Sequence, residues 1–325
     1  MTADLEQLKQ SLGNHWKGFS DFFQQALLSD IVLLNTINRY LLQHAGKQLR
    51  PLLTLLTAEM LGKITESTYL AASAVEMVHT CSLLHDDVID NADERRGAPS
   101  VKAMWRSNAS VLTGDYWLSR IFHMVITHQE YRLLPWFSGC LVNLSEGELL
   151  QLEKALHLSA TEAGYFTIIG KKTASLLAVS MASGAITADA PAETVQQLYD
   201  AGYQMGLAFQ IRDDILDYHK TNMLGKPTGN DLREQKLTLP LLHALAQADE
   251  PTRAKVLKWV KSVAKSKRHY TKIISFVKAH HGMEYAHTVL QQHVDKAKEI
   301  LASFPENEGR NKLMGLVDFL AVRKK

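Results

Sequence analysis

The sequence predicts an all-α protein, and three observations support that prediction. Apolar residues recur at intervals of three and four along several segments, which is the spacing of an amphipathic helix. Alternating apolar and polar residues bounded by turn pairs, which would indicate strands, are scarce. The eight prolines fall mostly between the periodic segments, as expected of a residue that ends or begins a helix. Without a Gly/Ser linker or a repeat, residues 1–325 are expected to form one domain of roughly a dozen helices.

Four periodic segments are clear enough to be named in chain order. They cover residues 27–41, 68–84, 198–216 and 256–263. Each has an apolar stripe that must be buried against a neighbouring helix. The second and third segments differ from the others because each ends in a cluster of aspartates, and these clusters need a separate explanation.

Composition and charge exclude several classes of protein. The chain has 36 basic and 34 acidic residues, a net charge of +2, so no nucleic-acid partner is indicated. Two cysteines, Cys81 and Cys140, are too few for a disulfide scaffold and are typical of a reducing compartment, so a cytoplasmic location is expected. The acidic first residues do not resemble a secretory leader. The longest uncharged run, residues 173–188, is too short for a transmembrane helix.

Two clusters of aspartates share one spacing. The first contains Asp86, Asp87 and Asp90, and the second contains Asp213, Asp214 and Asp217. In a helix the first and last members lie on one face, so their charges repel one another. One such cluster is most often a solvated surface, but two in apolar surroundings indicate a bound polycation. Oxygen ligands suit Mg²⁺, which typically combines one or two carboxylates with phosphate oxygens of a substrate.

Phosphate binding also needs cations, and pairs of basic residues lie close to both acidic clusters. Singly, each is more often a surface charge. The segment that begins at Lys171 is expected to open an apolar helix, whose free backbone N–H groups would bind an anion. The basic residues are Lys47 and Arg50, Arg95 and Arg96, Lys171 and Lys172, and Lys226 and Lys236.

These motifs together resemble the trans-isoprenyl (polyprenyl) diphosphate synthases, in particular the octaprenyl type, over essentially the whole chain. The motifs, in the family's order, are GKQLRP (46–51), LLHDDVID (83–90), RRG (95–97), GDYW (114–117), KKTA (171–174), FQIRDDILDY (209–218) and GKPTGNDLREQKLTLP (225–240). The resemblance implies an all-α bundle around a deep central cavity, usually in a homodimer. It implies a prenyltransferase that uses Mg²⁺ to join isopentenyl diphosphate to an allylic diphosphate, with no side-chain nucleophile.

The resemblance also implies a role for each matching position. The isopentenyl diphosphate would be held by Lys47, Arg50, His79 and Arg96. Mg²⁺ would be bound by Asp86 and Asp90 with Asp87 in support, and by Asp213 with Asp214 and Asp217 acting more indirectly. The allylic diphosphate would be held by Arg95, Lys172, Lys226 and Lys236, and oxygens of Thr173 and Gln210 would face the allylic cation. Without the resemblance, His79 would be taken for an ordinary histidine on a helix face.

Product length depends on the residues that precede Asp86 on its helix, because each turn descends about 5.4 Å below the metal site. These residues are Val78, Cys81 and Ser82, none of which is aromatic. In the family a bulky aromatic at the fourth or fifth position before the aspartates stops growth early. We therefore expect a medium- or long-chain product, such as a quinone side chain.

Three alternatives remain open. A short-chain farnesyl or geranylgeranyl diphosphate synthase would share every motif. A terpene cyclase would carry an Asn/Ser/Glu metal motif in place of the second aspartate cluster. A non-catalytic subunit would tend to lose the acidic or the basic motifs, and this chain keeps both.

Overall fold

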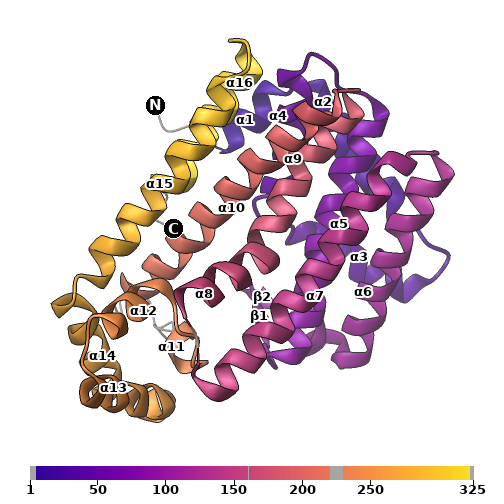
Figure 1. Cartoon of the computed structure of the whole chain (residues 1–325). Helices are drawn as coiled ribbons and strands as arrows, with labels where there is room; N and C mark the ends of the chain where they lie inside the picture. Colours follow the sequence, from indigo (N-terminus) through magenta and orange to yellow (C-terminus); the bar gives the residue numbers. More distant parts are fainter. Residues whose placement is uncertain (1–4, 160, 220–229, 323–325) are drawn as a thin grey trace. The chain divides into compact units, whose positions relative to one another are not determined.

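The computed structural model describes residues 5–159, 161–219 and 230–322, which form helices joined by short turns (Figure 1). One two-stranded hairpin, β1 (Glu94–Arg95) and β2 (Ala98–Pro99), interrupts them in the described ranges. The all-α prediction is therefore confirmed. The α-helices are α1 (Leu5–Ser11), α2 (Asn14–Ala26), α3 (Val32–Gln43), α4 (Leu49–Met60), α5 (Glu66–Ile89), α6 (Val101–Thr127), α7 (Leu134–His157), α8 (Glu162–Ile169), α9 (Ser175–Thr187), α10 (Ala192–His219), α11 (Asn230–Arg233), α12 (Leu239–Ala246), α13 (Glu250–Ser262), α14 (Lys267–Ala279), α15 (Gly282–Ala302) and α16 (Glu308–Val322). Single turns of other helix types are η1 (Tyr131–Leu133), η2 (Gly170–Ala174) and η3 (Val263–Lys265).

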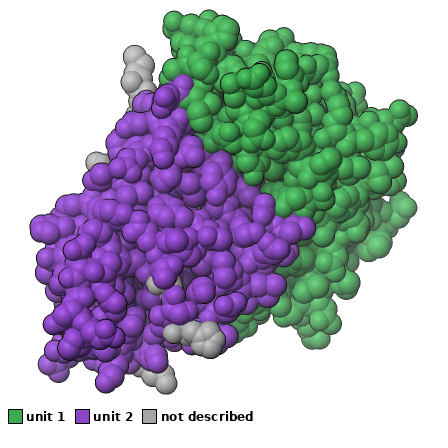
Figure 2. Space-filling model, in the orientation of Figure 1, with its two compact units in different colours: residues 1–141, 176–202, 300–316 green, residues 142–175, 203–299, 317–325 purple. Residues whose placement is uncertain are grey.

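The chain divides into two compact units, shown in different colours in Figure 2. Unit 1 contains residues 1–141, 176–202 and 300–316, and unit 2 contains residues 142–175, 203–299 and 317–325. Each unit is described by itself. The single domain expected over residues 1–325 stays a prediction.

Unit 1 is organised around α5, which packs against α2, α4 and α6. The helix begins after Thr65, whose backbone N–H donates to Thr68 Oγ1 at 3.1 Å, a local bond typical of a helix start. Its middle is buried on nearly every side, including Leu70, Val75 and Met77. Burial of this kind explains why the apolar pattern of residues 68–84 predicted a helix, and that prediction is confirmed.

The periodic segment 27–41 is helical only in part. Helix α3 begins at Val32, and the residues before it form a turn. The Ser29 backbone N–H donates to Asn35 Oδ1 at 3.0 Å, and the Ile31 N–H donates to Ser29 Oγ at 3.2 Å. These side-chain bonds compete with helix formation. The prediction was therefore wrong for residues 27–31, where apolar spacing continues without a helix.

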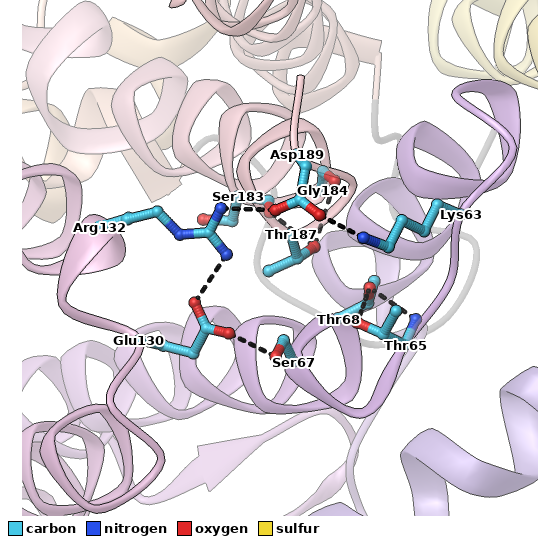
Figure 3. A network of polar contacts seen from close by, with 10 residues as sticks. All are labelled: Lys63, Thr65, Ser67, Thr68, Glu130, Arg132, Ser183, Gly184, Thr187 and Asp189. Carbon is cyan, nitrogen blue, oxygen red and sulfur yellow. Dashed lines mark hydrogen bonds and ion pairs between the residues drawn. The ribbon is translucent and has the colours of Figure 1, made fainter. Parts of the chain in front are cut away.

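A polar network joins segments of unit 1 that are distant in sequence (Figure 3). Arg132 donates to Asp189 Oδ1 at 2.7 Å and to Glu130 Oε2 at 3.1 Å. Asp189 also pairs with Lys63, and Glu130 accepts a bond from Ser67. The bonds from Lys63 and Arg132 lower the pKa of Asp189. Because Lys63, Arg132 and Asp189 are each about half exposed, the pairs contribute little stability individually and serve mainly to fix these turns.

In unit 2, α8, η2 and the second half of α10 approach one another closely. A Cβ on Gly206 of α10 would lie 2.4 Å from Ala174 Cα in η2, so only glycine allows this contact. Helix α10 covers the whole of the predicted segment 198–216, and α13 covers most of 256–263. Among the described helices, none is long and apolar enough to cross a membrane.

Candidate active site

The first aspartate cluster lies at the carboxyl end of α5. Asp86 is half-buried, Asp87 is buried, and Asp90 is exposed just after the last helical residue. The Asp90 N–H donates to the Asp86 carbonyl at 2.8 Å, so the backbone is still helical and the two residues share a face as predicted. No basic residue lies in the last turn of α5. Three acids at the negative end of a helix dipole are unfavourable unless cations neutralise them.

Asp87 has a partner of its own within unit 1. Arg95 Nε and Nη2 donate to Asp87 Oδ1 at 2.8 Å and 2.6 Å. The hairpin between β1 and β2 makes this contact possible, because Arg96 and Gly97 adopt positive φ angles of 55° and 79° in its turn. In this structure the predicted ligand of the allylic diphosphate, Arg95, instead neutralises the supporting aspartate of the metal cluster.

Arg96, in the RRG turn, contacts residues at and just before the first basic motif, GKQLRP. Its Nη1 donates to the His44 carbonyl at 3.1 Å, and its Nη2 donates to His79 Nε2 at 3.4 Å. A Cβ on Gly46 would lie 2.6 Å from Arg96 Cζ, and Gly46 has a φ of +71°. The backbone conformation therefore favours glycine at this position, and any side chain there would have to displace the end of Arg96. Two predicted residues, His79 and Arg96, thus lie together with Gly46, the neighbour of Lys47.

The electrostatics of this cluster favour an anion. Burial, followed by the charges of Arg50, Arg96 and Arg95, holds the pKa of His79 well below its usual value. Burial also lowers the pKa of Arg50 to about 10, although the Glu76 carboxylate opposes this effect. Arg50 Nε is a buried donor with no hydrogen-bond partner among the described residues. Positive charges so close together would be stabilised by a bound diphosphate.

Lys47 and Arg50 do not lie on the same helix. Helix α4 begins at Leu49, and Gln48 before it has a left-handed conformation with φ 48°. Lys47 therefore lies in the preceding turn, whereas Arg50 lies in the first turn of the helix.

The residues expected to set product length lie on α5 in unit 1. Val78 and Cys81 are buried, and Ser82 is half-buried with its Oγ donating to the His79 carbonyl at 2.8 Å. Burial, with Asp115 and Asp86 nearby, raises the pKa of Cys81 to about 12. The Cys81 side chain is therefore a neutral, buried thiol that packs as a small apolar group.

Unit 2 contains a cavity of about 140 Å³ that is lined by five of the predicted residues. Thr173 Oγ1 donates to Gln210 Oε1 at 2.8 Å, and Gln210 Nε2 donates to Asp214 Oδ1 at 2.8 Å. These bonds fix the orientation of the Gln210 amide from both ends. The five residues are Lys172, Thr173, Gln210, Asp214 and Lys236.

The prediction that a helix starts at Lys171 is wrong. Residues Gly170–Ala174 form the π-helical turn η2, which continues α8 directly into α9. No helix begins there, so the free backbone N–H groups that were expected to bind an anion are absent from this described segment. A π turn widens the helix locally, and here it lies beside the cavity.

Tyr165 and Asp231 line the same cavity and were not singled out from the sequence. The Tyr165 hydroxyl donates to Asp214 Oδ2 at 2.7 Å, and the Asp231 backbone N–H donates to Asp217 Oδ2 at 3.2 Å. Burial, followed by the charge of Asp231, raises the pKa of Asp214 well above its usual value. Tyr165 lies on α8, before the π turn, and no pattern in the sequence around it could have identified it.

Both oxygens of Asp214 accept hydrogen bonds from side chains, and this geometry suits an aspartate that orients its neighbours. The predicted diphosphate lysines have acidic partners within unit 2: Lys172 pairs with Glu148, and Lys236 pairs with Glu234 at 2.5 Å. Lys226 lies outside the described residues.

A divalent cation fits the donor set of the two clusters. Carboxylate oxygens without sulfur or imidazole ligands are typical of sites for hard cations. Within the described ranges, no group of three or more His, Cys, Asp and Glu side chains could hold a metal ion alone. A cation bound here would therefore need further oxygen ligands, such as those of a diphosphate.

Comparisons with known proteins show which family the chain is similar to. The sequence profile of the polyprenyl synthetase family matches residues 31–277. The octaprenyl diphosphate synthase of Haemophilus influenzae is 35% identical over 91% of this chain and 90% of its own length. Component 2 of the heptaprenyl diphosphate synthase of Geobacillus stearothermophilus is 33% identical over 98% of this chain and 99% of its own.

Two solved structures are similar over nearly the whole chain. The decaprenyl diphosphate synthase of Rhodobacter capsulatus superposes with a TM-score of 0.92 at 33% identity, covering 99% of this chain and 100% of that one. A polyprenyl synthase of Caulobacter crescentus CB15, complexed with calcium and isoprenyl diphosphate, has a TM-score of 0.90 at 31% identity, covering 100% and 99%.

Proposed function

Because this chain belongs to the polyprenyl synthetase family and is a prenyltransferase, we propose that it condenses isopentenyl diphosphate repeatedly with an allylic diphosphate to give an all-trans medium- or long-chain polyprenyl diphosphate. The observation that supports this most strongly is the grouping of the motif residues. Unit 1 gathers arginines around a neutral His79 beside one aspartate cluster. Unit 2 gathers Lys172, Thr173 and Gln210 around one cavity beside the other cluster.

The proposed cation is Mg²⁺, with Asp86 and Asp90 as ligands in the first cluster and Asp213 as a ligand in the second. Bound there, it would supply Lewis-acid stabilisation of the negative charge on the leaving diphosphate. The calcium in the Caulobacter crescentus structure supports a divalent cation in that relative. The carboxylate donor set of this chain suits the smaller ion equally.

The chain's own residues would bind and orient the two substrates. Arg50, Arg96 and Lys47 would hold the diphosphate of isopentenyl diphosphate, and the neutral ring of His79 could donate one hydrogen bond to it. Lys172 and Lys236 would exchange their glutamate partners for the allylic diphosphate, with Lys226 assigned by its motif alone. The Thr173 and Gln210 oxygens would face the allylic cation.

Incubation with Mg²⁺, farnesyl diphosphate and labelled isopentenyl diphosphate tests this function. We expect label to enter a product that, after removal of the diphosphate, migrates on thin-layer plates as a polyprenol longer than twenty carbons. The Asp86→Asn and Asp213→Asn variants are expected to lose incorporation. Failure of the purified chain to incorporate label, or formation of a cyclic hydrocarbon, would contradict the proposal, and a product of fifteen or twenty carbons would establish the short-chain alternative.

We also propose that the chain works as a homodimer in the cytoplasm. Val111, Leu112 and Ile126 of α6 are exposed, between 37% and 67%, and their spacing places them within one helical stripe. An exposed apolar stripe of this kind is typical of a subunit interface. Neither Cys81 nor Cys140 forms a disulfide within the described part of the chain, which supports a reducing compartment.

A second polypeptide is the alternative occupant of that stripe, because one relative is named as component 2 of its synthase. Incorporation of label by the purified chain alone would exclude an obligatory second component.

A further inference from the structure

The charge of this chain is distributed unevenly, and one segment of unit 2 holds a large share of it. Residues 251–283 contain nine lysines and arginines and no aspartate or glutamate, although the whole chain has a net charge of only +2. The rest of the chain therefore has more acidic than basic residues. The segment forms α13, η3 and α14, which pack against one another and lie at the lower left of Figure 1.

The basic residues lie on the outer faces of these two helices. In α13, Val256 and Val260 are fully buried, and Lys255, Lys258 and Lys261 are exposed on the opposite face. In α14, Ile273 and Val277 are buried, whereas Arg268 and Lys278 are exposed. We call these exposed residues together with Lys272 the basic face. Helical spacing thus places the charge toward solvent and the apolar side chains toward the core.

Among the described residues, no acidic side chain forms an ion pair with the basic face. Nine lysines elsewhere form ion pairs, from Lys9 to Lys312. By contrast, no lysine or arginine of the basic face forms an ion pair with a described residue. Lys255 and Lys272 come from different helices, and their ammonium groups lie 5.6 Å and 5.1 Å from the centre of the same Trp259 ring. Two like charges around one indole, without a carboxylate, leave a strongly positive surface.

We propose that the basic face binds the surface of an anionic lipid bilayer. Lysines predominate in it, and an ammonium group is a point charge that responds to surface potential without needing a fixed partner geometry. Nucleic acid fits less well, because the Trp259 ring is already contacted by Lys255, Lys272 and His269, and bases could not stack on it. The choice of a bilayer over an acidic protein rests on the proposed function, whose polyprenyl product is itself a membrane lipid.

Vesicle sedimentation without substrates tests the proposal on the full-length protein. We expect binding to vesicles of phosphatidylcholine that contain one-third phosphatidylglycerol, no binding to pure phosphatidylcholine, and release as salt is raised. The Lys255→Gln/Lys258→Gln/Lys261→Gln variant should bind about a hundredfold more weakly, since each lysine near such a surface is worth about fivefold. The control removes three exposed charges elsewhere, Lys17→Gln/Arg39→Gln/Lys296→Gln, and should bind like the wild type.

Three results would overturn the proposal: equal binding to both kinds of vesicle, no binding to either, or the same loss of binding in the control variant. If the protein is retained on polyglutamate or RNA but does not bind vesicles, the basic face binds another polyanion and the bilayer proposal is wrong. Thermal melting of both variants establishes that they fold. Because sedimentation needs no turnover, a chain that binds vesicles but incorporates no isopentenyl diphosphate would contradict the proposed function alone.

Discussion

At the scale of single residues, the arrangement around Asp214 leads to the most specific prediction. Tyr165 and Gln210 each donate to one oxygen of Asp214, and Gln210 in turn accepts from Thr173. Removing the tyrosine hydroxyl in Tyr165→Phe frees Asp214 to move and takes the Gln210 amide out of its fixed orientation. We expect kcat to fall about tenfold, the effect of one hydrogen bond of about 1–2 kcal/mol, with KM for isopentenyl diphosphate nearly unchanged.

Tyr285→Phe is the matched control, because the Tyr285 hydroxyl donates to the Glu162 carboxylate at 2.6 Å in the same unit but does not contact Asp214. Steady-state kinetics of both variants distinguish the two cases. An equal loss of kcat in Tyr165→Phe and Tyr285→Phe would show that the effect is merely one of stability.

Product length is a second residue-scale prediction. Ser82 lies four residues before Asp86, one helical turn below the proposed metal site, and is only half-buried. We expect Ser82→Phe to shorten the main product, because an aromatic ring would fill the space below the cation, whereas Ser82→Ala should leave it unchanged. Thin-layer sizing of the dephosphorylated products measures the product length of each variant. If the Ser82→Phe variant makes a product of unchanged length, Ser82 does not line the channel in which the product grows.

Residue identities in the site could be predicted from the sequence, but their contacts could not. The motifs named Asp87 and Arg95 as ligands of different groups, whereas the structure joins them in one ion pair. That pairing depends on the turn at Arg96 and Gly97, whose geometry spacing alone does not reveal. Tyr165 was missed because one tyrosine in an apolar helix has no distinctive pattern until its partner is placed.

At the scale of helices, the contact between α10 and α15 predicts how stability depends on pH. His293 Nδ1 lies 2.7 Å from Gln204 Oε1, and burial, with Lys296 nearby, lowers the pKa of His293 to about 4. The unfolded chain binds this proton near pH 6.5, so it holds more protons than the folded state between pH 6.5 and about 4. The free energy of unfolding should therefore fall as pH drops through this range.

The expected loss from this single group is about 1 kcal/mol, after allowance for the solvent that reaches the ring. Urea unfolding at pH 7.5 and 4.5 measures it. His293→Gln should lose less stability than the wild type between these pH values, and His281→Gln, at an exposed site, should behave like the wild type. Equal losses in all three proteins would refute the assignment.

Helix interiors were predictable because burial imposes a regular apolar spacing, as in α5 and α10. Helix ends were less predictable. Side-chain hydrogen bonds of Ser29 and Asn35 hold the residues before α3 in a non-helical turn. The π turn at Gly170–Ala174 continues α8 into α9, so no helix starts at Lys171. Both depend on local hydrogen bonds that apolar periodicity does not record.

At the scale of the whole molecule, the exposed stripe on α6 predicts how the chain assembles. Leu112 is 67% exposed, so Leu112→Glu should fold normally and separate the proposed homodimer into monomers. Light scattering after size-exclusion chromatography gives the mass of each. The Lys17→Glu variant is the control for an added acidic charge at another exposed position. A dimer that survives Leu112→Glu would exclude this stripe as the interface.

The fold class and the family could be predicted from the sequence because many ordered motifs and a uniform helical pattern agree. The division into two units could not, because its boundaries fall inside α7, α9, α10, α15 and α16, where the sequence shows no break. The net charge of +2 also concealed the basic face, since a total does not show where charges lie.

The central claim is that each of the two aspartate clusters binds divalent cations together with a diphosphate. Anomalous diffraction from crystals grown with Mn²⁺ and inorganic diphosphate tests it most directly. The account predicts manganese peaks about 2.2 Å from carboxylate oxygens of Asp86, Asp90 and Asp213, with diphosphate oxygens among the remaining ligands. Manganese bound at one cluster only, or a diphosphate that contacts neither, would contradict it.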